Sequence, residues 1–154
     1  MRTLVLGLGN LVHGDDGLGV HAIERLQKDA RVPPGVVLMD GGTQGLSLIP
    51  HISGFERVLV IDAIDVGKAP GTLIRLEGES VHKMPGKPSV HQLGFADLMI
   101  GLQLLGECPA EVVVLGVQPQ STEWTAELTA PVHASLEELT ALVIEQLESW
   151  AAVK

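Results

Sequence analysis

Three residues that lie far apart in the sequence have side chains that could contact one divalent transition metal. Asp16 and Asp62 offer carboxylate oxygens, and His91 offers an imidazole nitrogen. A set of two oxygens and one nitrogen leaves coordination positions open for another molecule. His91 is expected in the first turn of a helix, where the helix dipole disfavours the imidazolium and keeps the ring in its metal-binding neutral form. These residue types therefore indicate a metal-contacting site.

The same residues also have structural interpretations, which stay open at this point. Asp15 or Asp16 can cap the helix that follows them. Asp62 and Asp65 can accept hydrogen bonds from loop amides, a common role of aspartate after a strand. His91 can be a surface residue in a capped first turn. The spacing does not decide between the two interpretations, because no two of the three candidates share a local motif.

The hydrophobic pattern predicts the elements that would position these side chains. Short apolar or alternating runs predict five strands, at Arg2–Leu8, Val36–Met39, Arg57–Ile61, Thr72–Leu76 and Val112–Val117. Helical spacing predicts helices at Leu18–Asp29, Leu46–Ile52 and Val90–Leu105, and a final helix with an apolar stripe from Leu136 to Trp150. Capping boxes are expected at Ser89 with Gln92 and at Ser135 with Glu138, and Glu77–Pro88 is expected to be a loop.

Strands that alternate with helices predict an α/β fold. We expect a three-layer sandwich, with a mostly parallel five-stranded sheet flanked by helices, and a single domain over residues 1–154. Ligands of such sheets bind beyond the carboxyl ends of the strands. Four predicted segments follow strands there: Gly9–Gly17, Asp40–Thr43, Asp62–Asp65 and Gln118–Gln120. His91 begins a predicted helix beside them.

The glycines after the first strand also suggest a nucleotide-binding loop. Gly7-Leu8-Gly9 follows a strand, but Val12 occupies the place of the third glycine in a dinucleotide fingerprint. Asp15 and Asp16 would repel phosphates there. A nucleotide-binding oxidoreductase therefore remains an alternative that rests on the fold class alone.

Composition excludes several classes of partner. The formal net charge is −9, and the ten Lys and Arg residues are scattered, so no nucleic acid is expected as a partner. The apolar run at the N-terminus is too short for a signal peptide or a membrane span. Cys108 is the only cysteine, which excludes an intrachain disulfide and suits a reducing compartment. We expect a cytoplasmic protein without membrane insertion, in which Cys108 has no catalytic role.

Several motifs, taken in order, resemble the signature of nickel–iron hydrogenase maturation endopeptidases. They extend over about residues 2–119: Gly7-Leu8-Gly9-Asn10, Gly14-Asp15-Asp16-Gly17-Leu18-Gly19, Asp40-Gly41-Gly42-Thr43, Ile61-Asp62-Ala63, Ala69-Pro70-Gly71-Thr72, His91-Gln92-Leu93-Gly94 and Gly116-Val117-Gln118-Pro119.

The resemblance implies an activity and a site. Members of this family cleave a C-terminal extension from the large-subunit precursor of a nickel–iron hydrogenase after nickel insertion. Their three metal-contacting positions correspond here to Asp16, Asp62 and His91, which are also the candidates for catalysis. Many members have Glu at the first position, and Asp16 keeps the donor oxygens with a shorter reach.

The resemblance also implies how substrate and metal are bound. Gly41, Gly42, Thr43 and Gln118 are expected to shape the groove for the extended tail. Nickel is expected to arrive with the substrate, so no permanently bound cofactor is predicted, and the protein is expected to be a monomer. A nickel-binding accessory protein without protease activity remains a second alternative.

Overall fold

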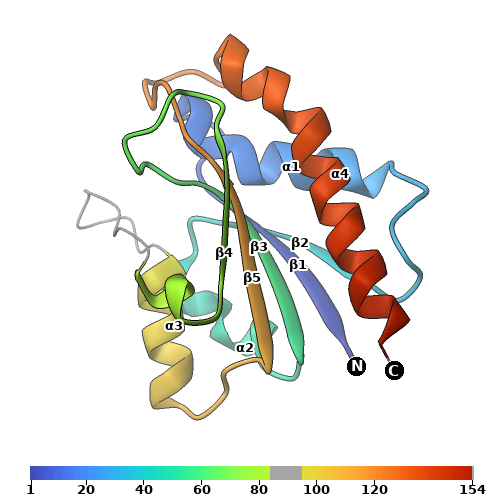
Figure 1. The fold of residues 1–154 in the computed structure, drawn as a ribbon. Helices are drawn as coiled ribbons and strands as arrows, with labels where there is room; N and C mark the ends of the chain where they lie inside the picture. The colour runs from blue at the N-terminus through green and yellow to red at the C-terminus, as the bar shows by residue number, and fades with distance from the viewer. Residues whose placement is uncertain (84–94, 154) are drawn as a thin grey trace.

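The computed structural model describes residues 1–83 and 95–153 of the 154-residue chain. Its centre is a five-stranded sheet with the order β2-β1-β3-β5-β4 (Figure 1). The strands are β1 (Thr3–Leu8), β2 (Val37–Gly42), β3 (Arg57–Ala63), β4 (Leu73–Glu77) and β5 (Glu111–Val117). Neighbouring strands run parallel except β4, which pairs antiparallel with β5 at the edge. The prediction of a mostly parallel five-stranded sheet is confirmed.

The central strands are apolar because both of their faces are covered. Every residue of β1 and of β3 is buried. Since successive side chains of a strand point to opposite faces, each strand contributes to two cores. Val5 and Ile61 pack on one side of the sheet, and Leu6 and Val60 pack on the other.

Helices cover both faces of the sheet and complete the three layers (Figure 1). α1 (Leu18–Gln27) and the long α4 (Ala130–Ala152) pack over one face. The opposite face is covered by α2 (Ile49–Ile52), α3 (Phe95–Leu104) and the 3-10 helices η2 (Gly45–Leu48) and η3 (Gly78–Lys83). The predicted three-layer α/β architecture is confirmed.

Two predictions about element boundaries are wrong. α4 begins at Ala130 after Thr129, so Ser135 lies inside the helix and donates a hydrogen bond to the Val132 carbonyl (2.6 Å) instead of forming a capping box with Glu138. Glu77 belongs to β4 and residues 78–83 form η3, so the first half of the expected loop is regular structure. The other predicted capping box, Ser89 with Gln92, lies outside the described residues.

Glycines allow α1 to approach the sheet unusually closely. A Cβ atom on Gly19 would lie 2.4 Å from the carbonyl oxygens of both Leu8 and Ile61. Opposite it, a Cβ atom on Gly7 would lie 2.3 Å from the Gly19 carbonyl oxygen. No side chain fits between these backbones, so the start of α1 lies directly on β1 and β3.

The two ends of the described chain lie near each other at the amino ends of the strands (Figure 1). One shallow cavity is lined by Met1 and Thr3 and also by Trp150 and Val153. Arg57, at the start of β3, lines the same cavity. The carboxyl ends of the parallel strands, where the candidate site is expected, lie on the opposite side of the sheet from the chain ends. We call this side the carboxyl edge and the side with the chain ends the amino edge.

Candidate functional site

The structure places Asp16 and Asp62 at the same edge of the sheet. Asp62 is the second-last residue of β3, and Asp16 lies in the 3-10 helix η1 (Gly14–Gly17), which follows β1 and packs against β3. Both residues are buried, at 7% and 1% exposure. Asp16 Oδ2 accepts a hydrogen bond from the Asn10 amide (3.0 Å), and Asp62 Oδ1 accepts one from the Ala63 amide (2.8 Å). Two carboxyl groups from separate segments are thus held at the predicted position.

His91, the third member of the predicted set, lies outside the described residues. Within the described ranges, no group of three His, Cys, Asp or Glu side chains could hold a metal ion. The metal-contacting role of Asp16, Asp62 and His91 therefore stays a prediction. The hydrogen bonds that backbone amides donate to Asp16 and Asp62 are compatible with a metal-contacting role, because each carboxylate has further lone pairs.

A small groove of about 200 Å³ opens between the loops that follow β1 and β2. Gly42 and Thr43 line it, together with Asn10 and Leu11 from the other loop. The Gly9 amide donates a hydrogen bond to the Gly42 carbonyl (3.0 Å), which ties the two loops together. Because the Asn10 amide also binds Asp16, the groove adjoins the carboxylate site.

The two glycines of the second loop have different tasks. Gly42 has φ of +50° and its amide donates to Asp40 Oδ1 (2.9 Å), so the turn requires it. Gly41 is different, because a Cβ atom on it would lie 2.8 Å from Leu6 Cδ1 and 2.9 Å from Leu8 Cδ2. Gly41 is therefore needed for packing below the groove, and of the two glycines only Gly42 has a positive φ.

Gln118, predicted to contact substrate, organises a neighbouring loop. Its side chain is buried, and Oε1 accepts hydrogen bonds from the amides of Val66 (2.8 Å) and Lys68 (3.2 Å). Nε2 donates to Asp65 Oδ1 (2.9 Å), and this bond, with one from the Gly67 amide, holds the pKa of Asp65 below its usual value. Substrate contact by Gln118 stays a prediction, while the structural interpretation of Asp65 is confirmed.

Asp15 has a role that the sequence did not reveal. The residue is fully buried, and its carboxylate accepts hydrogen bonds from the amides of Gln120 (2.8 Å), Ser121 (3.0 Å) and Thr129 (2.8 Å) and from Thr129 Oγ1 (2.7 Å). Burial raises the pKa of Asp15, but these bonds outweigh it, led by that of the Thr129 amide, and the pKa lies below its usual value.

The carboxylate of Asp15 thus fixes the segment between β5 and α4, residues 118–129. The expectation that Asp15 or Asp16 caps α1 is wrong, because the N-cap of α1 is Gly17 and no side chain caps it. Nothing local in the sequence identifies the partners of Asp15, which lie more than one hundred positions away.

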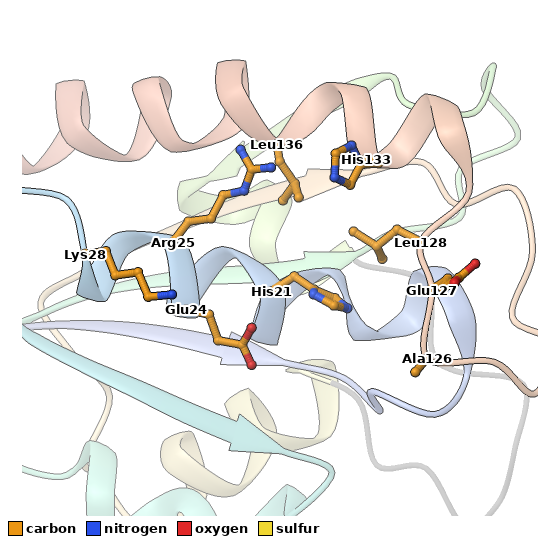
Figure 2. Close-up of a pocket in the computed structure, with 9 residues that line it drawn as sticks. All are labelled: His21, Glu24, Arg25, Lys28, Ala126, Glu127, Leu128, His133 and Leu136. Carbon is orange, nitrogen blue, oxygen red and sulfur yellow. The ribbon is translucent and has the colours of Figure 1, made fainter.

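A second, larger groove lies between α1 and α4 (Figure 2). Its volume is about 470 Å³, and its lining residues carry charges of both signs: His21, Glu24, Arg25, Lys28, Ala126, Glu127, Leu128, His133 and Leu136. Among the described residues, His21 Nε2 is buried there without a hydrogen-bond partner. None of the predicted site residues lines this groove.

Comparison with known proteins finds hydrogenase maturation proteins by sequence and by fold. Residues 20–146 match the family model described as hydrogenase maturation protease. The hydrogenase expression/formation protein HupD of Bradyrhizobium diazoefficiens is 40% identical over 152 residues, which cover 97% of this chain and 79% of that protein. The hydrogenase 2 maturation protease of Escherichia coli is 39% identical over 139 residues, covering 89% of this chain and 85% of that protein.

The fold agrees with the sequence comparison. The solved structure of the hydrogenase maturating endopeptidase HybD from Escherichia coli superposes with a TM-score of 0.89 at 36% identity, covering 97% of this chain and 93% of that one. A [NiFe] hydrogenase maturation protease HybD from Thermococcus kodakarensis has a TM-score of 0.75 at 26% identity and covers 96% of this chain and 99% of that one. This chain belongs to the hydrogenase maturation protease family.

Proposed function

We propose that this protein removes the C-terminal extension of the large-subunit precursor of a nickel–iron hydrogenase, after nickel has been inserted. The observation that carries the proposal is the pair Asp16 and Asp62, which are buried at one edge of the sheet beside a groove between two glycine loops. Membership of the protease family supports peptide hydrolysis and leaves the nucleotide-binding alternative without a supporting observation.

In this proposal nickel is part of the substrate. Asp16, Asp62 and His91 would contact the nickel that the precursor presents, so the resting enzyme needs no metal of its own. Two buried carboxylates attract a divalent cation more strongly than exposed carboxylates do. A precursor without nickel would lack this contact, and the enzyme would distinguish finished precursors from unfinished ones.

Hydrolysis then requires a water molecule to add to the carbonyl carbon of the scissile bond, after which the C–N bond breaks and the new amine takes up a proton. Nickel near the carbonyl could polarise it or activate the water. Asp16 is the better candidate for a general base, because it lies next to the groove through its bond with the Asn10 amide. Gly42 and Thr43 would line the path of the extended tail, with Gly41 beneath them and Gln118 fixing the neighbouring loop.

The proposal also includes a monomeric protein in the cytoplasm. Among the described residues, no helix has the length and hydrophobicity needed to span a membrane. Cys108 is exposed and is the only cysteine, so no intrachain disulfide would be lost in a reducing compartment.

Mass spectrometry of a purified precursor mixed with this protein tests the function. We expect the nickel-loaded precursor to lose its C-terminal extension and the nickel-free precursor to stay intact. Asp62→Asn and His91→Ala should each reduce the rate at least about a hundredfold, because each removes a ligand or a catalytic group. Asp29→Asn is a matched control, since Asp29 forms an ion pair with Arg31 (2.7 Å) on the protein surface and the predicted site includes neither residue.

The possible results separate the parts of the proposal. Equal cleavage of the nickel-free precursor would contradict recognition through nickel but not the peptidase activity. Transfer of nickel to the precursor without loss of its C-terminal extension would indicate the accessory protein instead. Full activity of His91→Ala would remove His91 from the site.

A further inference from the structure

An exposed apolar surface lies beside the candidate site. Trp124 is 78% exposed, Val12 46% and Leu11 36%. The His13 ring contacts the Trp124 ring, with centroids 4.1 Å apart. We call Leu11, Val12, His13 and Trp124 the rim patch.

The rim patch is one continuous surface built from two distant segments. The Thr125 amide donates a hydrogen bond to the Val12 carbonyl (3.0 Å), and the Gly14 amide donates to the Thr125 carbonyl (2.9 Å). His13 Nδ1 lies 3.1 Å from the Thr122 carbonyl oxygen. These contacts hold Trp124 beside the segment that leads from β1 to Asp16.

The fold holds this surface in a defined conformation. Residues 118–127 contribute no apolar side chain to the hydrophobic core, because Gln118 is the one buried residue among them. The segment is instead fixed from below by the buried carboxylate of Asp15, which binds Gln120, Ser121 and Thr129. An exposed tryptophan on such a rigid support loses little conformational entropy when a partner covers it.

The rim patch is also continuous with the candidate site. A Cβ atom on Gly17 would lie 2.9 Å from the Leu11 Cα atom, so Leu11 lies against the residue that follows Asp16. Leu11 also lines the groove that contains Gly42 and Thr43. A protein substrate that reaches Asp16 and this groove must therefore approach the rim patch.

The charges around Trp124 indicate what kind of surface would cover it. Glu123 and Glu127 lie on either side of Trp124 in the sequence and are exposed, and within the described part of the chain neither forms an ion pair. An apolar segment bordered by Lys or Arg would bury the tryptophan and pair these carboxylates.

We propose that the rim patch docks the large-subunit precursor through an apolar segment bordered by basic residues, next to the bond that is cut. This inference rests on the proposed function and deepens it. Trp124 would act as the main anchor, because buried tryptophans contribute a large share of the binding energy at protein interfaces. The patch would contribute to precursor binding and not to the chemical step.

The test compares Trp124→Ala with Leu104→Ala in the cleavage of nickel-loaded precursor. Leu104 is a matched control, since it is 83% exposed and lies at the end of α3, away from the carboxyl edge. We expect Trp124→Ala to raise KM at least about fivefold with kcat nearly unchanged, and Leu104→Ala to change neither. A Glu123→Gln, Glu127→Gln double variant should raise KM less and weaken its dependence on salt.

Hydroxyl-radical footprinting of the wild-type protein gives a readout that does not depend on variants. Nickel-loaded precursor should protect Trp124 from oxidation and leave Leu104 unprotected. Normal cleavage by the wild type with no protection of Trp124 and no change in KM for Trp124→Ala would overturn the docking surface alone. Protection of Trp124 by self-association, seen as a dimer in light scattering, would also overturn it. Failure of the wild type to cut the precursor would overturn the proposed function and this inference together.

Discussion

Asp15 and Asp16 are adjacent in the chain but serve different parts of the molecule. Asp16 lies at the candidate site, where its carboxylate binds the Asn10 amide. Asp15 instead holds the segment of residues 118–129 through four hydrogen bonds. The residue types predicted the first role, because carboxylates after a strand are typical of sites in α/β proteins. The second role depends on a contact across more than one hundred residues, which no local pattern encodes.

Replacing Asp15 with Asn should weaken the fold measurably at neutral pH. The change removes the charge and one acceptor position, so that buried amides lose part of their hydrogen bonding. We expect the free energy of unfolding to fall by about 2 kcal/mol at pH 7, measured by urea denaturation. Glu138→Gln on the exposed face of α4 is the control and should change the free energy of unfolding by less than about 0.5 kcal/mol.

The acid side of the stability profile provides an independent check on Asp15. Its folded-state pKa lies below the usual value, so its carboxylate stabilises the fold above about pH 4, and this contribution is lost as the pH falls through the folded-state pKa. The difference between wild type and Asp15→Asn should therefore shrink as the pH falls below about 4. A difference that stays constant as the protein is acidified would contradict the ionised state of Asp15.

At the scale of elements, the sequence predicted the buried strands well. It predicted poorly where a helix begins when that position depends on a contact with a distant residue. β1 and β3 are continuous apolar runs, because parallel strands are covered on both faces. The start of α4 was missed because Thr129, which precedes it, is fixed by Asp15 and not by a local capping motif. For the same reason the exposed Trp124 could not be assigned to the edge that holds Asp16.

The close approach of α1 to the sheet can be tested with two glycine variants. Gly19→Ala would place a methyl group 2.4 Å from two backbone carbonyl oxygens, which cannot move without shifting β1 or β3. Gly101→Ala in α3 would meet the flexible side chain of Ile49 at 2.8 Å. We expect Gly19→Ala to lower the free energy of unfolding by about 2–3 kcal/mol and Gly101→Ala by less than about 1 kcal/mol, measured by chemical denaturation. Equal losses would contradict the packing argument.

For the whole molecule, the two edges of the sheet have separate tasks. The carboxyl edge holds Asp16 and Asp62, whereas the amino edge joins the end of α4 to β3. Arg57 Nη1 donates a hydrogen bond to the Trp150 carbonyl (2.6 Å), and Arg57 Nε lies 3.4 Å from Glu111 Oε2. Stability at the amino edge should therefore be separable from activity at the carboxyl edge.

Replacing Arg57 with Met should affect stability and leave catalysis unchanged. Met keeps much of the apolar stem but loses the hydrogen bond to the Trp150 carbonyl. We expect the free energy of unfolding to fall by about 2 kcal/mol in denaturant titration, with kcat per folded molecule at the wild-type value. A large loss of kcat in fully folded protein would contradict the separation of the two edges.

The nearness of the two chain ends has a practical consequence (Figure 1). A bead or sensor chip attached through either end would face the amino ends of the strands, opposite to Asp16 and Trp124. The immobilised protein should then still capture a precursor from solution. The captured precursor could be released and its mass measured by mass spectrometry after each cycle of binding. One preparation could in this way be offered a series of precursors with altered tails.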